Sequence, residues 1–213
     1  MAILKNGING GFSGKAGTTV GKIVRGQQVI TGPYDKTKVP FSDAQLLRQK
    51  YLGAMSNFLC AGSDLIALGF KPKKEKHKPM NLAIAYNLKH AITGGLAEVE
   101  ILYPQVVWSI GDLKNPLNFE ITALPGAAVK FSWTLSTVVS CYAGATDRLM
   151  VLVYNATKDK LTVKLNVAER ADLMYILQLH PGFAGDQLHC YCFFAGYRGM
   201  TSNSLYAQVA CKP

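Results

Sequence analysis

The chain has 213 residues, of which 49% are hydrophobic, and a formal net charge of +10 at pH 7. This apolar content can fill a core in one large domain or two small ones, which excludes a disordered tail. No stretch approaches the roughly 18 uninterrupted apolar residues of a membrane-spanning helix, so no membrane span is expected. The first residues lack the apolar region of a secretory signal peptide. We therefore expect synthesis in the cytoplasm, with an assembled particle or extracellular filament as an open final location.

The positive charge is concentrated in the first 80 residues. They hold 13 Lys and Arg against 4 Asp and Glu, whereas residues 81–213 hold 10 against 9. A composition shift of this kind separates modules. Either the N-terminal region meets an anionic partner, or its basic side chains are simply solvated.

Residues 10–25 read GGFSGKAGTTVGKIVR, with five glycines, three Lys or Arg residues and no acid. A phosphate-binding P-loop needs G-x-x-x-x-G-K-[ST] between a strand and a helix, because the loop amides surround the phosphates and the hydroxyl holds magnesium. Here Asn9 stands at the first glycine position and Ala16 at the hydroxyl position. We therefore interpret residues 1–40 as a glycine-rich basic arm with a β-hairpin.

The hairpin is predicted over residues 21–34. Two β-branched pairs, Ile23-Val24 and Val29-Ile30, lie on either side of a short polar segment. Gly26 supplies the turn geometry, and the Gly-Pro pair that follows the second run ends its strand.

A long amphipathic helix is predicted over residues 42–69. Ser42 and Gln45 form a capping box, and apolar residues then recur at three- and four-residue steps. Such a helix must pack its apolar face against another part of the protein. Gly53 and Gly62 are the two points at which it could bend.

A lysine-rich loop separates this helix from a second, shorter one. Residues 71–79 read KPKKEKHKP, and prolines near both ends prevent the helix from continuing. The second helix is predicted over residues 80–93 and ends at a Gly-Gly pair. Together these elements form a predicted helical segment over residues 41–95.

From residue 97 the sequence changes to short apolar runs separated by turn residues. The runs are EVEILY, QVVWSI, NFEITAL, AVKFSWTL, RLMVLVYN, LTVKLNV, DLMYILQL, LHCYCFF and SLYAQVA. This pattern predicts an antiparallel immunoglobulin- or fibronectin-like β-sandwich over residues 96–213. The fold class is therefore α+β, with a hairpin and two helices before the sandwich. Trp133 is expected in the core between the sheets; the alternative is that it lines a ligand cleft.

The residue patterns favour a non-enzymatic protein without metal or cofactor. No histidine stands in a metalloprotease or hydrolase motif, and the acids are scattered singly. An odd number of cysteines argues against a disulfide framework. We interpret Cys60, Cys141, Cys190, Cys192 and Cys211 as reduced thiols. Cys190 and Cys192 are expected on one face of a strand, because alternate strand residues share a face.

Binding to nucleic acid is an alternative function. The candidate anion contacts are Lys15, Lys22, Arg25, Lys73, Lys74 and Lys76. They could neutralise phosphates, but no zinc-finger spacing, aromatic RNA-binding pattern or basic recognition helix accompanies them. Nucleic acid is therefore a less favoured partner.

The favoured hypothesis is a structural protein that self-assembles into a filament or particle through its N-terminal arm. Glycines allow close backbone approach, and short β-branched runs can add to an exposed sheet edge. The candidate interface residues are Phe12, Gly14, Lys15, Gly17, Val20, Ile23, Val24, Val29 and Ile30. The expected partner is a second copy in a head-to-tail homo-oligomer. A weaker alternative is an adhesion or carbohydrate-binding sandwich, which an exposed aromatic patch would favour.

The sequence also resembles a family of uncharacterised Bacteroidota proteins. The resemblance rests on GFSGKAGTTVGKIVRGQQVI, PFSDAQLLRQKYLGAMSNFL, NLAIAYNLKHAITG, LHCYCFF and SNSLY. Members of that family pair an N-terminal GFSGKxG segment with a C-terminal β-domain. The chain departs from the pattern after the hairpin, where a short basic R-x-x-P segment is replaced by Thr31-Gly32-Pro33. The resemblance implies a two-part, non-enzymatic architecture and transfers no catalytic residues.

Overall fold

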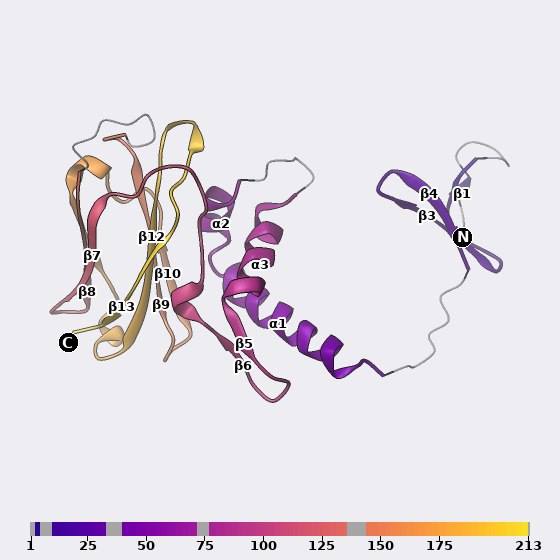
Figure 1. Ribbon diagram of the computed structural model, residues 1–213, viewed down its shortest axis with the longest axis horizontal. Helices are drawn as coiled ribbons and strands as arrows, with labels where there is room; N and C mark the ends of the chain where they lie inside the picture. The colour runs from indigo at the N-terminus through magenta and orange to yellow at the C-terminus, as the bar shows by residue number, and fades with distance from the viewer. Residues whose placement is uncertain (1–2, 5–9, 33–39, 72–76, 136–143, 213) are drawn as a thin grey trace. The chain divides into compact units, whose positions relative to one another are not determined.

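The computed structural model describes residues 3–4, 10–32, 40–71, 77–135 and 144–212. The chain divides into two compact units, Met1–Phe41 and Ser42–Pro213, which are called here the N-terminal unit and the main unit. Figure 1 labels the elements of both units.

The N-terminal unit is an antiparallel sheet in the order β1-β2-β3-β4. Its strands are β1 Ile3–Leu4, β2 Phe12–Ala16, β3 Thr19–Val24 and β4 Gln27–Thr31. The hairpin predicted from the sequence is β3–β4, with Val24 opposite Gln27. Between them Arg25 and Gly26 have φ angles of 53° and 83°, the two positive values that a type I′ turn requires. The arm before the hairpin also forms strands, which the sequence pattern did not predict because glycine-rich segments lack clear alternation.

The main unit begins with three α-helices, α1 Asp43–Cys60, α2 Ser63–Gly69 and α3 Pro79–His90. The predicted capping box is present: the Gln45 N–H donates to Ser42 Oγ, and the Ser42 N–H donates to Gln45 Oε1 at 3.0 Å. The predicted long helix is broken, and α1 and α2 lie at 90° to each other. The break is at Gly62, where a Cβ atom would lie 2.4 Å from the Trp108 ring.

The shorter predicted helix ends earlier than residue 93. Helix α3 stops at His90, and the next residues form a small hairpin of β5 Ile92–Gly94 and β6 Val99–Ile101. On α3 the buried polar residue is Asn87, whose amide donates to Val107 O at 2.9 Å and accepts from Val107 N–H at 2.8 Å. This pair of hydrogen bonds fastens α3 to the segment that follows β6.

Two antiparallel sheets complete the main unit. Their strands are β7 Leu117–Leu124, β8 Ala128–Thr134, β9 Arg148–Asn155, β10 Lys160–Lys164, β11 Met174–Gln178, β12 Gln187–Ala195 and β13 Leu205–Ala210. The first sheet has the order β10-β9-β12-β13 and the second the order β11-β8-β7. Short 3-10 helices are Tyr103–Gln105, Arg170–Asp172, Pro181–Phe183 and Tyr197–Gly199. The α+β class with a fibronectin- or immunoglobulin-like sandwich is thus confirmed.

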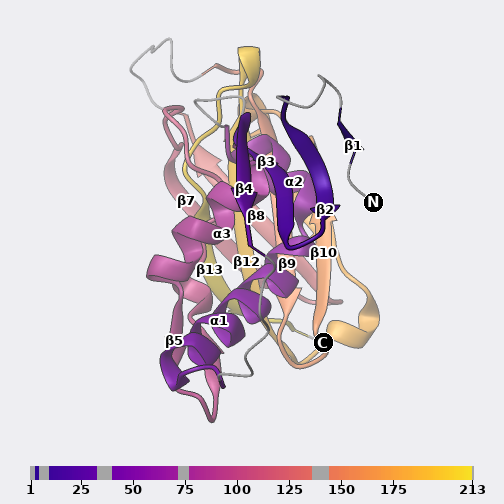
Figure 2. The same ribbon diagram turned by 90° about the vertical axis from the view of Figure 1, so that its right-hand side faces the viewer.

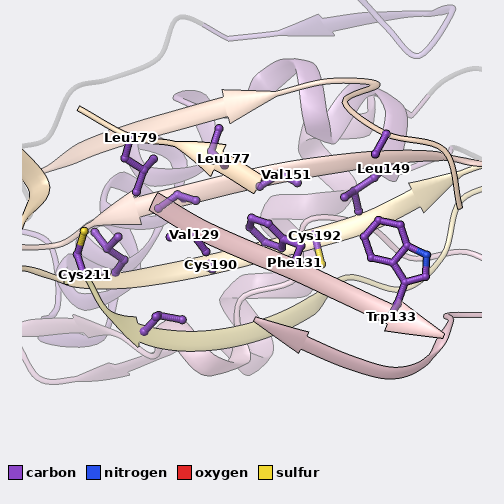
Figure 3. Packing of buried hydrophobic residues seen from close by; sticks show 14 of the residues in the cluster. Val129, Phe131, Trp133, Leu149, Val151, Leu177, Leu179, Cys190, Cys192 and Cys211 are labelled. Carbon is purple, nitrogen blue, oxygen red and sulfur yellow. The ribbon is translucent and has the colours of Figure 1, made fainter. Parts of the chain in front are cut away.

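The sheet β10-β9-β12-β13, called here the central sheet, is buried on both faces. Along β9, Leu149, Val151 and Val153 face the second sheet, whereas the alternating residues Met150 and Leu152 pack with the helices. Figures 1 and 2 show the helices along one side of this sheet. On the other side, Figure 3 shows Phe131 and Trp133 of β8 packed against the central strands. The main unit therefore has three layers and two cores.

This layering affects the boundary predicted between the helical segment 41–95 and the sandwich 96–213. Helices α1 and α2 pack their apolar residues into the same cluster as Leu152 of β9 and Tyr191 of β12. Since both segments bury one shared sheet, they form a single compact unit that starts at Ser42. The boundary between the two units lies between Phe41 and Ser42, one residue from the predicted end of the arm at residue 40.

The two tryptophans of the main unit lie in different cores. The run QVVWSI forms no ladder; Ile110 makes only an isolated bridge with Phe70, and Trp108 is fully buried between the helices and the central sheet. Trp133 is a core residue as expected, because it is 3% exposed and packs edge-on against Phe194 with ring centroids 5.3 Å apart. Its indole Nε1 donates to Arg170 O at 2.7 Å.

Candidate assembly interface

The β3–β4 hairpin presents two faces of different chemistry, because residues opposite each other in a ladder share a face. One face, called here the valine face, carries Val20, Lys22, Val24, Gln27, Val29 and Thr31. The other, called the isoleucine face, carries Gly21, Ile23, Gln28 and Ile30. Ile23 and Ile30 are 63% and 64% exposed. The isoleucine face therefore offers apolar surface and no charge.

Glycines let the start of β2 cross the isoleucine face. A Cβ at Gly21 would lie 2.2 Å from the carbonyl oxygen of Phe12, and a Cβ at Gly11 would lie 1.3 Å from the Gln28 side chain. Gly14 has a φ of 113°, a conformation that favours glycine. The glycines of the arm thus allow close packing within the unit and do not form a phosphate cradle.

The N-terminal unit lacks a core of its own among its described residues. Within residues 10–32, Gly21 alone is buried, and every apolar side chain is half-buried or exposed. The structure places all nine candidate interface residues in β2, β3, β4 or the turn at Gly17. A small sheet without a packed apolar face is at best marginally stable in water. The described residues of this unit therefore form no packed apolar face of their own.

The candidate anion contacts are only partly brought together. Lys15 lies opposite Val20, so Lys15 and Lys22 share the valine face, and Arg25 occupies the hairpin turn. All three are exposed, and residues 10–32 contain no acid. The other three predicted contacts, Lys73, Lys74 and Lys76, lie outside the described residues.

The sandwich has four edge strands, which are β10, β13, β11 and β7. Strand β10 begins at Lys160 and ends at Lys164, and lysines protect an edge from pairing. Strand β13 packs against β7. Strand β11 reads MYILQ and carries no charge; its Met174 and Ile176 are 47% and 45% exposed. The sequence predicted this strand, but its place at an edge depends on the sheet order, which periodicity does not reveal.

The main unit holds one buried ion pair among its described side chains. Arg170 Nε lies 3.0 Å from Asp147 Oδ2, and both side chains are at most 5% exposed. Arg170 Nη2 also donates to Lys114 O at 2.9 Å, and the guanidinium stacks over Phe194. Burial lowers the pKa of Arg170, and the adjacent Asp147 carboxylate partly offsets this lowering. Every partner is internal, so this pair holds the sandwich together and presents no reactive group.

One histidine and several thiols of the main unit are buried in its core. His189 Nδ1 lies 2.8 Å from the Tyr206 hydroxyl, and burial lowers the pKa of His189. Cys190 and Cys192 lie in the same core cluster, as their spacing predicted. Burial raises the pKa of Cys190 to about 12, which makes it an inert core thiol. Cys60 is exposed and has no disulfide partner among the described cysteines.

A hollow of about 940 Å³ lies between α1, the β9–β10 turn and residues 180–183. At its rim, Lys158 Nζ lies 2.5 Å from Asp186 Oδ2, and the Tyr154 hydroxyl donates to Asp159 Oδ1 at 2.9 Å. The hydrogen bond from Lys158 lowers the pKa of Asp186. The polar groups at the rim thus satisfy one another's hydrogen-bonding capacity. Among the residues described, no three His, Cys, Asp or Glu side chains gather where they could hold a metal ion.

The described helices are α1, α2 and α3. None of them is long and apolar enough to cross a membrane alone; the bent pair α1 and α2 meets the length and composition criterion only together.

A family model described as a family of unknown function (DUF6266) matches residues 11–208. None of the curated proteins compared with the chain matches it.

Fibronectin domains are among the solved structures that match part of the chain. The chicken CNTN1 FN1-FN3 structure has a TM-score of 0.37 at 13% identity, covering 49% of this chain and 34% of that one. The fn3 domain of human collagen alpha-1(XX) has a TM-score of 0.36 at 14% identity, covering 47% and 87%. A family 76 glycoside hydrolase from a bovine Bacteroides thetaiotaomicron strain has a TM-score of 0.36 at 11% identity, covering 46% and 21%. The chain thus spans about a third of the chicken structure and about a fifth of the hydrolase.

Proposed function

We propose that this chain, which belongs to the DUF6266 family of unknown function, is a non-enzymatic structural subunit that self-assembles into a filament or particle. The N-terminal unit is the assembly element, and a second copy of the chain is its partner. We expect its relatives to be Bacteroidota proteins that share the GFSGKxG segment of residues 11–17.

The observation that carries this proposal is the exposed isoleucine face on a sheet without a core. Ile23 and Ile30 are each more than 60% exposed, although burying an isoleucine side chain stabilises by about 1.5–3 kcal/mol. A neighbouring surface would recover this free energy and would also satisfy the free edge of β4. The main unit differs in that it fills two cores of its own.

The contact is expected to be head-to-tail. The N-terminal unit and the surface that receives it are different parts of the chain, so each copy offers one and uses the other. Such a contact closes into a ring or particle if the rotation between copies permits, and otherwise continues as a filament.

Nucleic acid is the second candidate partner, favoured by the exposed Lys15, Lys22 and Arg25 in a segment without acids. Binding of this kind weakens steeply as salt rises, because counterions are released from the phosphates. Assembly through apolar side chains does not weaken in this way. A salt titration of the oligomer and of binding to a mixed-sequence DNA therefore separates the two candidates.

The direct experiment removes residues 1–40 and compares the product with the full chain by light scattering and electron microscopy. We expect the full chain to form oligomers and the truncated chain to be a folded monomer, because the main unit starts at Ser42. A full chain with both Lys22→Gln and Arg25→Gln is the matched control, because both residues are exposed and neither is a candidate interface residue; it should still assemble. Oligomers that persist without residues 1–40 would contradict the proposal.

A further inference from the structure

Strand β11 has an outer edge that no described residue covers. The Trp133 N–H donates to Leu173 O, and the Leu179 N–H donates to Ala127 O. In an antiparallel ladder these bonds make Tyr175 and Leu177 the residues that bond to β8. The backbone N–H and C=O groups of Met174, Ile176 and Gln178 therefore point away from the sheet. No described group bonds to them.

Strand β4, the last strand of the N-terminal sheet, also has a free outer edge. The two-residue turn makes Val24 and Gln27 a hydrogen-bonded pair, and Val29 bonds to β3 in the same way. The backbone groups of Gln28 and Ile30 are thus left at the free edge. Strands β4 and β11 are each five residues long and uncharged.

Other edges of the main unit are poorer partners for β4. Strand β10 carries Lys160 and Lys164, and the N-terminal unit is itself basic, so pairing there would bring like charges together. Strand β7 has an irregular register between Leu117 and Glu120, which interrupts a continuous ladder. Strand β13 is covered in part by β7. Of the sandwich edges described, β11 combines a regular ladder, exposed apolar side chains and no charge.

We propose that β4 of one copy adds to the free edge of β11 in the next copy and extends that sheet to β4-β11-β8-β7. This inference rests on the proposed function and identifies the surface that receives the arm. In an antiparallel register Ile30 pairs with Ile176, and Gln28 pairs with Gln178. Ile30 then lies beside Ile176 on the outer face of the sandwich, so that backbone bonds and apolar contact form together.

Cross-linking between two separate variants tests this register. Ile30→Cys and Ile176→Cys are made in different chains, each in a background with Cys60→Ser and Cys141→Ser, because Cys60 is exposed and Cys141 lies outside the described residues. Paired residues have Cα atoms about 5.5 Å apart, which suits a disulfide. We expect a disulfide-linked dimer when the two chains are mixed and oxidised, and none from either chain alone.

Lys164→Cys on the edge of β10 is the matched control for Ile176→Cys, since both positions are exposed on edge strands. Equal cross-linking of Ile30→Cys to both positions would overturn the inference. A third variant carries both Ile30→Cys and Ile176→Cys in one chain. If a disulfide forms only within that chain and never between two chains, the inference is also overturned. A mixture without cross-links, in a protein whose oligomers still require residues 1–40, would refute this receiving surface and leave the proposed function standing. Oligomers that do not require residues 1–40 would refute both.

A charge placed on the edge provides a second measurement. Ile176→Lys should convert the oligomer to monomer without changing the unfolding midpoint, because the side chain lies on the outer face. Thr122→Lys is the control: Thr122 is exposed in the same row of that face but lies on β7, at the opposite edge of the sheet from β11. Loss of assembly in both variants, or in neither, would contradict the proposed pairing.

Discussion

The N-terminal sheet and the central sheet are both four-stranded and antiparallel, yet they differ in what covers them. In β9 every residue from Leu149 to Asn155 is buried, whereas in β3 only Gly21 is. The central sheet has helices on one face and a second sheet on the other. Strand pairing is antiparallel in both cases, so the two sheets differ in the layers packed against them, and burial of apolar side chains between layers is what stabilises a sheet in water.

The largest effect is expected from a cavity in the covered sheet. Phe194 on β12 is fully buried and lies between Trp133 and the Arg170 guanidinium. Phe194→Ala should lower the free energy of unfolding of the main unit by about 3–5 kcal/mol. Denaturant unfolding followed by tryptophan fluorescence measures this. If Phe194→Ala lowers the free energy of unfolding no more than a surface substitution does, the packing difference between the two sheets would be contradicted.

A smaller effect distinguishes the two glycines of the helical layer. Gly62→Ala would push a Cβ into the Trp108 ring, and we expect a cost of about 1–3 kcal/mol. At Gly53 a Cβ would meet no atom within 4 Å, so Gly53→Ala should stabilise α1 by about 0.5–1 kcal/mol. Thermal unfolding of the two variants compares them directly. A change in stability of the same sign in both variants would contradict the close contact between Gly62 and Trp108 at the helix break.

The pH dependence of the main unit should carry a contribution from His189. Burial lowers the pKa of His189 in the folded protein, so the unfolded chain binds the proton more readily. Stability is then complete above the ordinary histidine pKa of about 6.5 and declines as the pH falls through that value. His189→Gln should reduce this decline. The check is the difference between unfolding free energies at about pH 7.5 and about pH 5.5, measured for both proteins; an identical decline would contradict it.

The smallest effect on stability is expected in the uncovered sheet. Ile23→Ala should change the unfolding free energy of the main unit by no more than about 0.5 kcal/mol, because its side chain contacts no core. Its effect should appear in assembly instead, as a higher protein concentration needed for oligomers. Sedimentation at several concentrations measures this. A large loss of main-unit stability with unchanged assembly would reverse the comparison between the sheets.

Much of the main unit was predictable from local patterns. The run RLMVLVYN became β9 with the same bounds, and the Ser42 capping box starts α1 as expected. The three-layer arrangement was not predictable, because a fully apolar strand is consistent with burial on both faces but does not say what covers each. Asn87 illustrates the same limit: a polar residue is buried since a distant main-chain segment at Val107 satisfies its amide.

The candidate interface was predictable in its composition and not in its geometry. The β-branched pairs around Gly26 predicted the hairpin, and its type I′ turn follows from Arg25-Gly26. Which residues share a face required the register, and the crossing of Phe12 over Gly21 is a tertiary contact without a periodic signal. The β11 edge was hidden for a related reason, because the order of strands in a sheet depends on contacts between distant segments.

The most direct test of the central claim is amide hydrogen exchange at the free edge of β4. The Gln28 and Ile30 N–H groups have no partner in β3, so in a dilute monomer they should exchange rapidly. If the N-terminal unit is completed by another copy, their exchange should slow as protein concentration rises and oligomers form. Lys22 pairs with Val29 inside the sheet, so the exchange rate of the Lys22 N–H provides an internal reference. Exchange at Gln28 and Ile30 that stays fast in the oligomer would contradict the account.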